Sequence, residues 1–469
     1  MTRTRVLFCD FLGLPKGKYV QPDLAKSGDI GFAACALSVS FDRDLLNIPG
    51  TGLFDGIPDM KLSLEKETFK SWQENTEIAL GDLKFEGKEC DLCPRTNLKK
   101  IIKEFNDLDL KPMVGLEFEA YVFERDEDGV WIPYNTPGAF VYGTGPSNDP
   151  KNLMGKIWER ATKMGLTVES INGEYDNGQF ELTLGFDEAL KACDNAFLFK
   201  TMAKEIAFQE GLILSFMPKP IPERGGSGLH VNFSFVDKSK INVIEKDGKL
   251  SERANDCISG LIHHHEGLSA LLASTVNSYD RLQPASMAGY WANWAGDHRM
   301  VTIRTSTSSS NSARIEHRTA DGAGNPYIVT SSILKASMLG IKNKYKLLPA
   351  EDLDGMENVR ATKHVPSSLS KAISALENDK VLKSKIGENF CNAFVEIKRD
   401  EAVRLQDKNI DEIRESITYL LCRIFFITSI SFSEEFDIMS FDLQHICGSG
   451  LTKISPESLI SLIDDHSPA

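Results

Sequence analysis

Long apolar runs, closely spaced cysteines and clusters of basic residues are all scarce in this 469-residue sequence. The longest apolar stretch, residues 417–432, carries Arg423 and several hydroxyl side chains, and it falls short of the roughly 20 apolar residues that a membrane span needs. We therefore predict a buried helix there. The 53 Lys and Arg residues are outnumbered by 67 Asp and Glu residues, which argues against a nucleic-acid partner and against binding to an anionic membrane.

The nine cysteines are scattered along the chain and form no framework of close pairs, which fits a reducing compartment. Only Cys90 and Cys93 are spaced like half of a zinc site, and we interpret them as ordinary thiols because no second pair follows. The apolar residues near the N-terminus are interrupted by Asp10 and soon followed by Lys16 and Lys18, so we predict no signal peptide. These features predict a cytoplasmic protein.

The length of the chain predicts two domains, because single cores rarely grow beyond about 250 to 300 residues. Residues 6–12 are rich in β-forming side chains, and residues 97–107 have the apolar spacing of an amphipathic helix. We place the boundary near residue 96, with a small β domain at 1–96 and a large domain at 97–469.

The large domain combines strand patterns with helical ones, which predicts an α+β class with an antiparallel sheet. The strand patterns lie at 113–123, 179–184 and 230–235, and the helical ones at 150–164, 187–210 and, less regularly, 366–421. Residues 305–312, rich in Ser and Thr, predict a loop.

Two pairs of glutamates stand out in these strand patterns. Alternation along one strand places Glu117 and Glu119 on the same face, and Glu174 and Glu181 flank an Asn-Gly turn. Carboxylates held together repel each other unless a cation lies between them. Taken alone, however, each pair is also typical of a solvated sheet face or an exposed hairpin, so the metal interpretation depends on convergence.

Three further segments carry polar side chains suited to anionic substrates. A glycine-rich loop at 225–228 enters a strand that starts near His230, and such loops let a substrate approach the backbone. Strand-like segments at 299–304 and 314–318 bring four arginines and Glu316 into a short span, as phosphate and carboxylate substrates require. A flexible turn and an arginine-rich strand edge without function are the alternatives.

Six segments spread over about 210 residues resemble, in the same order, the motifs of the glutamine synthetase family. They are Glu-Phe-Glu at 117–119, the pair Glu174 and Glu181 with Gly-Gln between them, Met-Pro-Lys-Pro at 217–220, Gly-Ser-Gly-Leu-His at 226–230, Asn-Ser-Tyr-Asp-Arg-Leu at 277–282, and Arg-Ile-Glu-His-Arg at 314–318 followed by Asn-Pro-Tyr at 325–327. The resemblance implies a small N-terminal β-grasp-like domain. It also implies a catalytic domain whose antiparallel sheet forms a partial barrel flanked by helices.

The resemblance further implies ATP as co-substrate and two divalent cations, Mg or Mn, in each active site. By position, one ion would be held by Glu119, Glu174 and Glu181, and the other by Glu117, His230 and Glu316. Five hard oxygen donors and one imidazole suit these metals. In this family the γ-phosphoryl group of ATP passes to the side-chain carboxylate of glutamate, and an amine then attacks. Rings of subunits, commonly twelve, are implied as well.

The same correspondence assigns roles to arginines and to residues around the substrates. The catalytic arginines would be Arg281, Arg299 and Arg318, and the glutamate site would comprise Gly226, Arg281 and Arg318. The nucleotide site would comprise Phe186, Asn232, Ser234, Arg299, Arg304 and Arg314.

Departures from the family pattern concern the amine. Met287 stands where ammonia-using members carry a flap glutamate, and the segment with their ammonium-binding aspartate is absent. Burying an ammonium ion without these carboxylates costs on the order of several kcal/mol. We therefore expect a primary organic amine whose apolar part is buried by Met287, Tyr290, Trp291 and Trp294, with core packing as the alternative for the two tryptophans.

The combined expectation is an ATP-dependent ligase that forms a γ-glutamyl amide from L-glutamate and a primary amine through γ-glutamyl phosphate. A glutamine synthetase that uses ammonia is the first alternative. A catalytically silent regulatory relative is the second.

Overall fold

The computed structural model describes residues 1–352, 360–414 and 416, which belong to one compact unit spanning residues 1–424. The helix predicted at 417–432 lies outside these residues. Within the described part of the chain, no helix is both long and apolar enough to cross a membrane.

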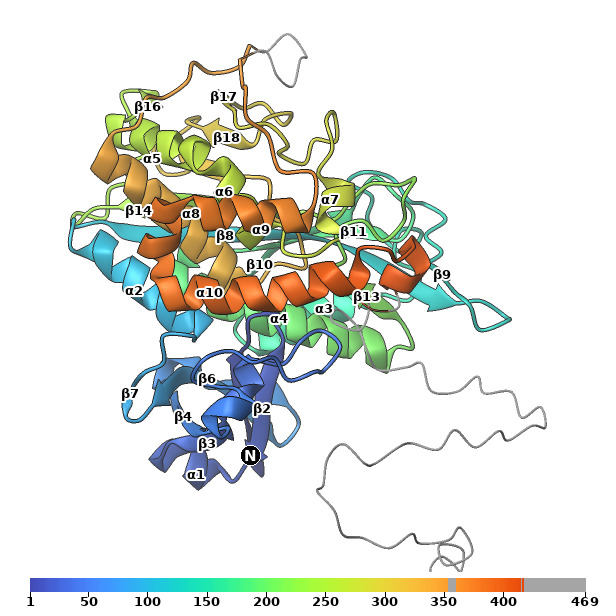
Figure 1. Cartoon of the computed structure of the whole chain (residues 1–469). Helices are drawn as coiled ribbons and strands as arrows, with labels where there is room; N and C mark the ends of the chain where they lie inside the picture. The colour runs from blue at the N-terminus through green and yellow to red at the C-terminus, as the bar shows by residue number, and fades with distance from the viewer. Residues whose placement is uncertain (353–359, 415, 417–469) are drawn as a thin grey trace, which may run out of the picture. The chain divides into compact units, whose positions relative to one another are not determined.

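The N-terminal residues form a seven-stranded sheet (Figure 1). Its order is β2-β1-β6-β4-β3, with β5 and β7 also paired to β6, and the central pair β1 and β6 is parallel. The elements are β1 (Arg3–Cys9), β2 (Pro15–Val20), α1 (Pro22–Ser27), β3 (Ile30–Ala33), β4 (Asp59–Leu64), β5 (Lys70–Gln73), β6 (Thr76–Phe85) and β7 (Lys88–Glu89).

The two faces of β1 pack into different cores. Val6 and Phe8 belong to an apolar cluster of the small sheet itself, whereas Leu7 and Cys9 join the large core of the chain. Because successive side chains of a strand point to opposite faces, one short apolar strand can serve both cores. The small sheet therefore packs one face of β1 into the large core.

A buried arginine also ties the small sheet to the helices after it. Arg95, at the start of α2 (Pro94–Asn106), donates to both carboxylate oxygens of Asp194 on α4 (Ala189–Gln209), each at 2.8 Å. It also donates to Asp82 of β6 and to Glu65, which directly follows β4, at 2.8 and 2.7 Å. The boundary predicted near residue 96 falls inside α2 and stays a prediction.

A second sheet of ten strands carries the candidate site. Its order is β10-β11-β8-β14-β19-β18-β17, with β9, β12 and β13 paired to the long strand β8. All pairs are antiparallel apart from β17 with β18, which confirms the predicted α+β class. The strands are β8 (Lys111–Arg125), β9 (Trp131–Pro133), β10 (Val168–Gly173), β11 (Gln179–Leu184), β12 (Asp187–Glu188), β13 (Ile213–Ser215), β14 (Leu229–Val236), β17 (Trp294–Gly296), β18 (Ile303–Ser306) and β19 (Arg314–His317). The hairpin of β15 (Glu245–Lys246) and β16 (Lys249–Leu250) is separate.

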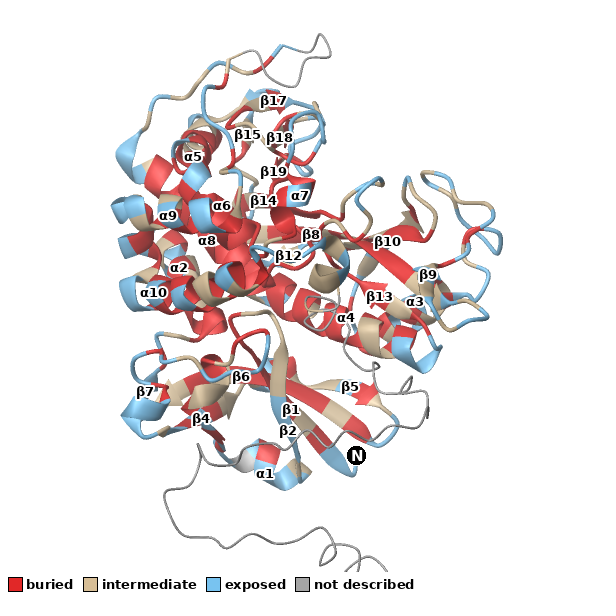
Figure 2. Cartoon of the chain, turned by 45° about the vertical axis from the view of Figure 1, so that its right-hand side comes forward, coloured by how far each residue is buried: buried red, intermediate tan, exposed pale blue. Residues whose placement is uncertain are grey.

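Helices pack with this sheet around one large apolar core, and Figure 2 shows α4 and α8 mostly buried. They are α2 (Pro94–Asn106), α3 (Leu153–Lys163), α4 (Ala189–Gln209), α5 (Glu252–His263), α6 (His265–Leu272), α7 (Ser278–Arg281), α8 (Pro326–Asn343), α9 (Leu369–Asn378) and α10 (Lys380–Leu405). Helices α5 and α8 cross at Gly260 and Gly340, where a Cβ on either residue would overlap a backbone oxygen of the other helix.

Two sequence predictions near the site were wrong. The strand predicted at 299–304 begins only at Ile303, which leaves Arg299 in the preceding loop. Thr305 and Ser306, predicted in a loop, belong to β18 and pair with β19. Short strands bounded by serine and threonine lack the apolar alternation that marks a strand in sequence.

Candidate active site

Six side chains that the sequence singled out converge on the large sheet in two groups of three. Within each group, the atoms able to bind a metal lie within 4.8 Å of one another: Glu117, His230 and Glu316 form the first group, and Glu119, Glu174 and Glu181 form the second group. Strand register explains the convergence. His230 on β14 lies opposite Glu117 on β8. On the other side of β8, Glu181 of β11 lies opposite Glu119.

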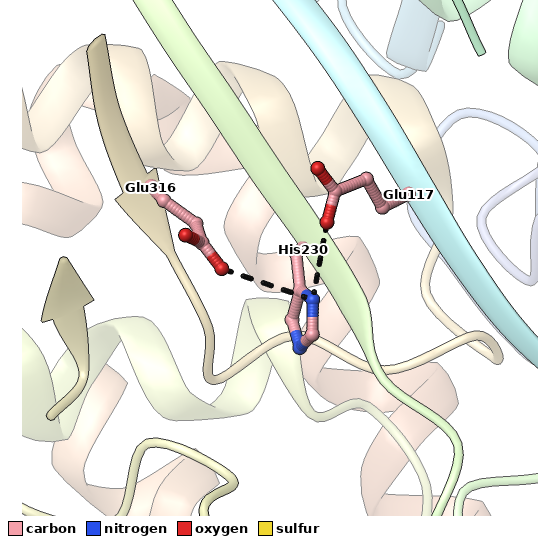
Figure 3. A group of neighbouring side chains, drawn as sticks. All are labelled: Glu117, His230 and Glu316. Carbon is pink, nitrogen blue, oxygen red and sulfur yellow. Dashed lines mark ion pairs between the residues drawn. The ribbon is translucent and has the colours of Figure 1, made fainter. Parts of the chain in front are cut away.

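In the first group the imidazole lies between two carboxylates (Figure 3). His230 Nδ1 is 3.4 Å from Glu117 Oε2 and 3.8 Å from Glu316 Oε1. The Asn232 amide donates to Glu117 Oε1 at 2.9 Å. Burial disfavours the charged carboxylates, but His230 and the other donors outweigh it, so the pKa of Glu117 and that of Glu316 are both lowered.

In the second group the carboxylates crowd one another. Burial and the neighbouring charges of Glu117 and Glu174 raise the pKa of Glu181 to about 7. Burial and Glu119 likewise raise the pKa of Glu174. A divalent cation would relieve this repulsion, and a set of three carboxylates is the kind of site that Mg²⁺ or Mn²⁺ occupies. The donors present therefore fit the implied metals.

The hairpin between β10 and β11 brings Glu174 to Glu181, as the sequence predicts. The backbone N–H of Glu174 donates to the carbonyl of Gln179 at 2.9 Å and closes the turn. Gly178 has φ of 77°, a left-handed conformation that favours glycine, and a Cβ there would lie 3.0 Å from the Val122 carbonyl oxygen. Glycine thus allows the turn to pack directly against β8.

Two of the predicted arginines are buried beside these groups. Arg318 pairs with Glu316, and its other terminal nitrogen lies 3.5 Å from the main-chain oxygen of Met287. Arg281 donates to the carbonyl oxygens of Thr319 and Arg318 at 3.0 and 3.2 Å. Burial lowers the pKa of Arg281. A guanidinium held by neutral carbonyls keeps its charge available for an anionic substrate.

The other three predicted arginines have different surroundings. Arg299 is exposed in the loop before β18. Arg304 donates to Glu316 at 3.0 Å. Arg314 donates through Nε to the side-chain oxygen of Asn232 at 2.9 Å. Arg314 therefore helps to orient Asn232, which in turn contacts the first group.

The glycine-rich loop predicted at 225–228 packs tightly against Arg281. A Cβ on Gly226 would lie 2.7 Å from Arg281 Cγ, and one on Gly228 would lie 2.7 Å from Arg281 Nη2. The backbone N–H of Gly228 donates to Glu119 Oε2 at 2.6 Å. These contacts favour the binding-loop interpretation over a flexible turn, because the glycines are required by a close approach.

A pocket of about 410 Å³ lies next to the first group. Its lining includes Glu117 and four of the predicted nucleotide residues, namely Phe186, Asn232, Ser234 and Arg314. Arg299 and Arg304 do not line it. The Phe186 side chain is 69% exposed, so its ring is free to stack on a planar base. The structure thus brings together most of the predicted nucleotide site and leaves those two arginines outside the pocket.

The four predicted amine-pocket residues have separate surroundings. Met287 is 46% exposed on the loop that Arg318 contacts. Tyr290 stacks on His364 with ring centroids 5.0 Å apart, and Trp291 lies edge-on to both rings. The indole N–H of Trp294 donates to a main-chain carbonyl at 2.7 Å, and its ring packs against the core. For Trp294 the geometry favours the alternative of core packing.

Cys90 and Cys93 are buried free thiols. Neither belongs to a metal-type group in the described part of the chain. Burial raises the pKa of Cys90 to about 11, so this thiol stays protonated.

Sequence reasoning missed three side chains that contact the glycine-rich loop: Tyr121, Asp176 and Gln179. Their partners in the loop lie 47 to 104 residues away along the chain. No local pattern marks such pairs. The Gly-Gln step before Glu181 was the one available signal, and it pointed to the metal ligands rather than to the loop.

Comparison with known proteins identifies the family. The glutamine synthetase catalytic domain matches residues 91–415. The glutamine synthetase of Pyrococcus abyssi is 32% identical over 441 residues, covering 90% of this chain and 96% of that protein. The chain belongs to the glutamine synthetase family. The glutamine synthetase of Halobacterium salinarum is 30% identical over 359 residues, covering 73% of this chain and 79% of that one. Family membership makes this chain an ATP-dependent ligase of glutamine synthetase type.

Solved structures of the same fold support this. Apo GmaS is 27% identical with a TM-score of 0.76, covering 88% of this chain and 96% of GmaS. The GmaS complex with ADP has the same identity and TM-score. Glutamine synthetase of Plasmodium falciparum, at 20% identity and a TM-score of 0.74 over 87% and 94% of the two chains, shares the fold. These similarities confirm the partial-barrel sheet flanked by helices that the glutamine synthetase resemblance implies.

Proposed function

We propose that this member of the glutamine synthetase family joins the γ-carboxylate of L-glutamate to a primary organic amine through γ-glutamyl phosphate, converting ATP to ADP. The observation that carries the proposal is the arrangement around His230. Its Nδ1 faces Glu117 and Glu316, and its Nε2 lies 3.8 Å from Glu119, so one imidazole joins the two groups of carboxylates. Phosphoryl transfer between two anions requires this density of cation-binding and cationic side chains.

In this proposal the two groups hold two divalent cations, which neutralise charge on the phosphoryl oxygens when bound. The buried Arg281 and Arg318 hold the glutamate carboxylate or the transferring phosphoryl group. Gly226 presents the loop backbone to glutamate. The nucleotide occupies the pocket next to Glu117, with its base against Phe186 and Ser234 and its phosphates toward Arg314 and Arg299. Arg304 then supports Glu316 rather than the nucleotide.

Two observations favour an organic amine over ammonia. Met287 lies on the loop that Arg318 contacts, and an exposed thioether there offers apolar contact but no carboxylate for ammonium. GmaS structures are also similar over nearly the whole chain at 27% identity. The names of the curated relatives favour the second candidate, glutamine synthesis from ammonia, at 32% identity.

We also propose that the chain assembles with copies of itself, as the family typically does. Leu53 and Phe54, in a short 3-10 helix (Leu53–Asp55) of the N-terminal part, are 66% and 85% exposed. Neighbouring large apolar side chains left in water are typical of a surface that another chain covers. Light scattering coupled to gel filtration should report an oligomer, and a monomer would contradict this part of the proposal.

The test of function is ADP release with Mg²⁺, ATP and L-glutamate against ammonium, methylamine, isopropylamine, ethanolamine, putrescine and aniline, with mass spectrometry of the product. Reactions without glutamate correct for ATP hydrolysis alone. A preference for one organic amine and its γ-glutamyl amide would support the proposal. Saturation by low ammonium with glutamine as product would replace it with glutamine synthesis, and no ADP release with any amine would contradict both.

A further inference from the structure

We propose that Asp176 is a positioning residue that fixes the glycine-rich loop in the shape that binds the amino-acid substrate. This inference rests on the proposed function, in which that loop holds glutamate. Asp176 lies in the turn between Glu174 and Glu181, so it would also tie the substrate loop to the hairpin that carries two candidate metal ligands.

Asp176 accepts two hydrogen bonds, one from the first residue of the loop and one from the neighbouring strand. Its Oδ2 accepts from the backbone N–H of Gly225 at 2.6 Å and from the Tyr121 hydroxyl at 2.8 Å. The same hydroxyl oxygen lies 3.1 Å from the Gly225 carbonyl oxygen. Tyr121 is fully buried on β8, so this contact is fixed to the central strand of the sheet.

A second set of contacts joins the same two segments. The buried Gln179 side chain donates to the Gly226 carbonyl at 2.9 Å. Arg224 donates to the carbonyl of Asn177 at 3.3 Å. The loop and the hairpin turn are therefore linked at successive positions, and a displacement of the turn would move the loop.

The contact also explains why residue 225 is glycine. A Cβ at this position would lie 3.0 Å from Asp176 Oδ2 and 3.4 Å from Gln179 Oε1. The Asp176 carboxylate thus occupies the space that a side chain at position 225 would need. The other end of the loop is held by Glu119 through the N–H of Gly228.

The test compares Asp176→Ala with Asp176→Asn, because asparagine keeps an oxygen that can accept both hydrogen bonds but has no charge. Asp126→Ala is the matched control, since one carboxylate oxygen of Asp126 also accepts two hydrogen bonds, here both from backbone N–H groups at 3.0 and 2.8 Å, in an exposed turn away from the site. Tyr121→Phe is a milder variant that removes one hydroxyl and keeps the buried ring.

Two readouts are needed: L-glutamate binding by calorimetry with Mg²⁺ and a non-hydrolysable ATP analogue, and steady-state KM and kcat with the preferred amine. We expect Asp176→Ala to weaken glutamate binding by about tenfold to a hundredfold, the range for a hydrogen bond to a charged acceptor. The KM for ATP should stay within about twofold, a split that general loss of structure would not produce. Asp176→Asn should restore most of the affinity, Tyr121→Phe should lose about threefold, and Asp126→Ala should match the wild type.

Glutamate affinity unchanged in Asp176→Ala would overturn the inference. So would an asparagine variant as weak as the alanine one, which would show that the charge itself binds the substrate. Equal losses for glutamate and ATP would show that the variant had disrupted the whole hairpin, and would overturn it as well. A wild-type protein that binds glutamate but releases no ADP with any amine would contradict the proposed function, while the calorimetric comparison would still decide the role of Asp176.

Discussion

Replacing Glu181 with glutamine should make the metal-free protein more stable and the enzyme inactive. The metal-binding atom of Glu181 lies within 4.8 Å of those of Glu119 and Glu174. At an effective dielectric constant of about 20, two unit charges this far apart repel by about 3 kcal/mol. Glu181 is only partly buried, so solvent screening reduces this energy. We expect the neutral side chain to raise the free energy of unfolding by about 1 to 2 kcal/mol.

The assay is thermal unfolding in EDTA and across a Mg²⁺ titration, together with ADP release. In EDTA the variant should unfold at a higher temperature than the wild type. Added Mg²⁺ should raise its Tm less, because a ligand that binds only the folded state stabilises according to its affinity. ADP release should fall by at least about a hundredfold, since glutamine is a weaker ligand for a hard cation.

Glu127→Gln is the control, because Glu127 is an exposed carboxylate outside both groups and its loss should leave all three measurements unchanged. The reasoning would be refuted if Glu181→Gln were less stable than the wild type in EDTA. A full Mg²⁺ response with retained turnover would refute the assignment of Glu181 as a metal ligand.

Three further predictions follow from buried or exposed side chains. Arg95→Met should lower the free energy of unfolding by about 3 to 5 kcal/mol in urea titrations, because the buried Asp194 loses its guanidinium partner while Asp82 and Glu65 keep only Lys99, and Asp194→Asn added to it should recover part of the loss. Burial lowers the pKa of His265 to about 4, so the folded state holds this residue neutral. As the pH falls from about 6.5 toward 4, the unfolded state takes up a proton on His265 that the folded state does not, so the free energy of unfolding should fall. In thermal unfolding measured over this pH range, His265→Asn should make the decrease of Tm with falling pH smaller. Met287→Glu should raise kcat/KM for ammonium relative to bulky amines by at least about tenfold in competition assays, and an unchanged ratio would exclude Met287 from the amine site.

Sequence patterns could predict the two pairs of glutamates because each pair depends on a local rule, whereas the division of six ligands into two groups came from the family resemblance. Alternation places Glu117 and Glu119 on one face of β8, while Phe118 and Ala120 are buried on the other. The Asn-Gly step requires a turn and therefore brings Glu174 near the residue seven positions later. Family resemblance added the order of the segments, which periodicity alone does not contain.

Contacts between segments far apart in the chain could not be predicted from the sequence. No local pattern assigns a role to Asp176, because its hydrogen-bond partner Gly225 lies 49 residues farther along the chain. Arg304 is similar, because only the register of β18 against β19 puts it opposite Glu316 and makes it a partner of that carboxylate. The end of β18 was also missed, since Thr305 and Ser306 are recognisable as a strand only through their pairing with β19.

The charge balance of the two groups bears on whether the protein is catalytically silent. Glu316 in the first group has Arg304 and Arg318 as partners, so that group is largely neutralised by the chain itself. The second group has no comparable arginine pair among the described residues, and burial and mutual repulsion oppose its ionisation. A catalytically silent protein would be more stable with glutamine in place of the three glutamates of the second group, because the neutral amides would not repel one another. Three crowded carboxylates are useful only when a cation joins them, which argues for a working metal site and against the silent alternative.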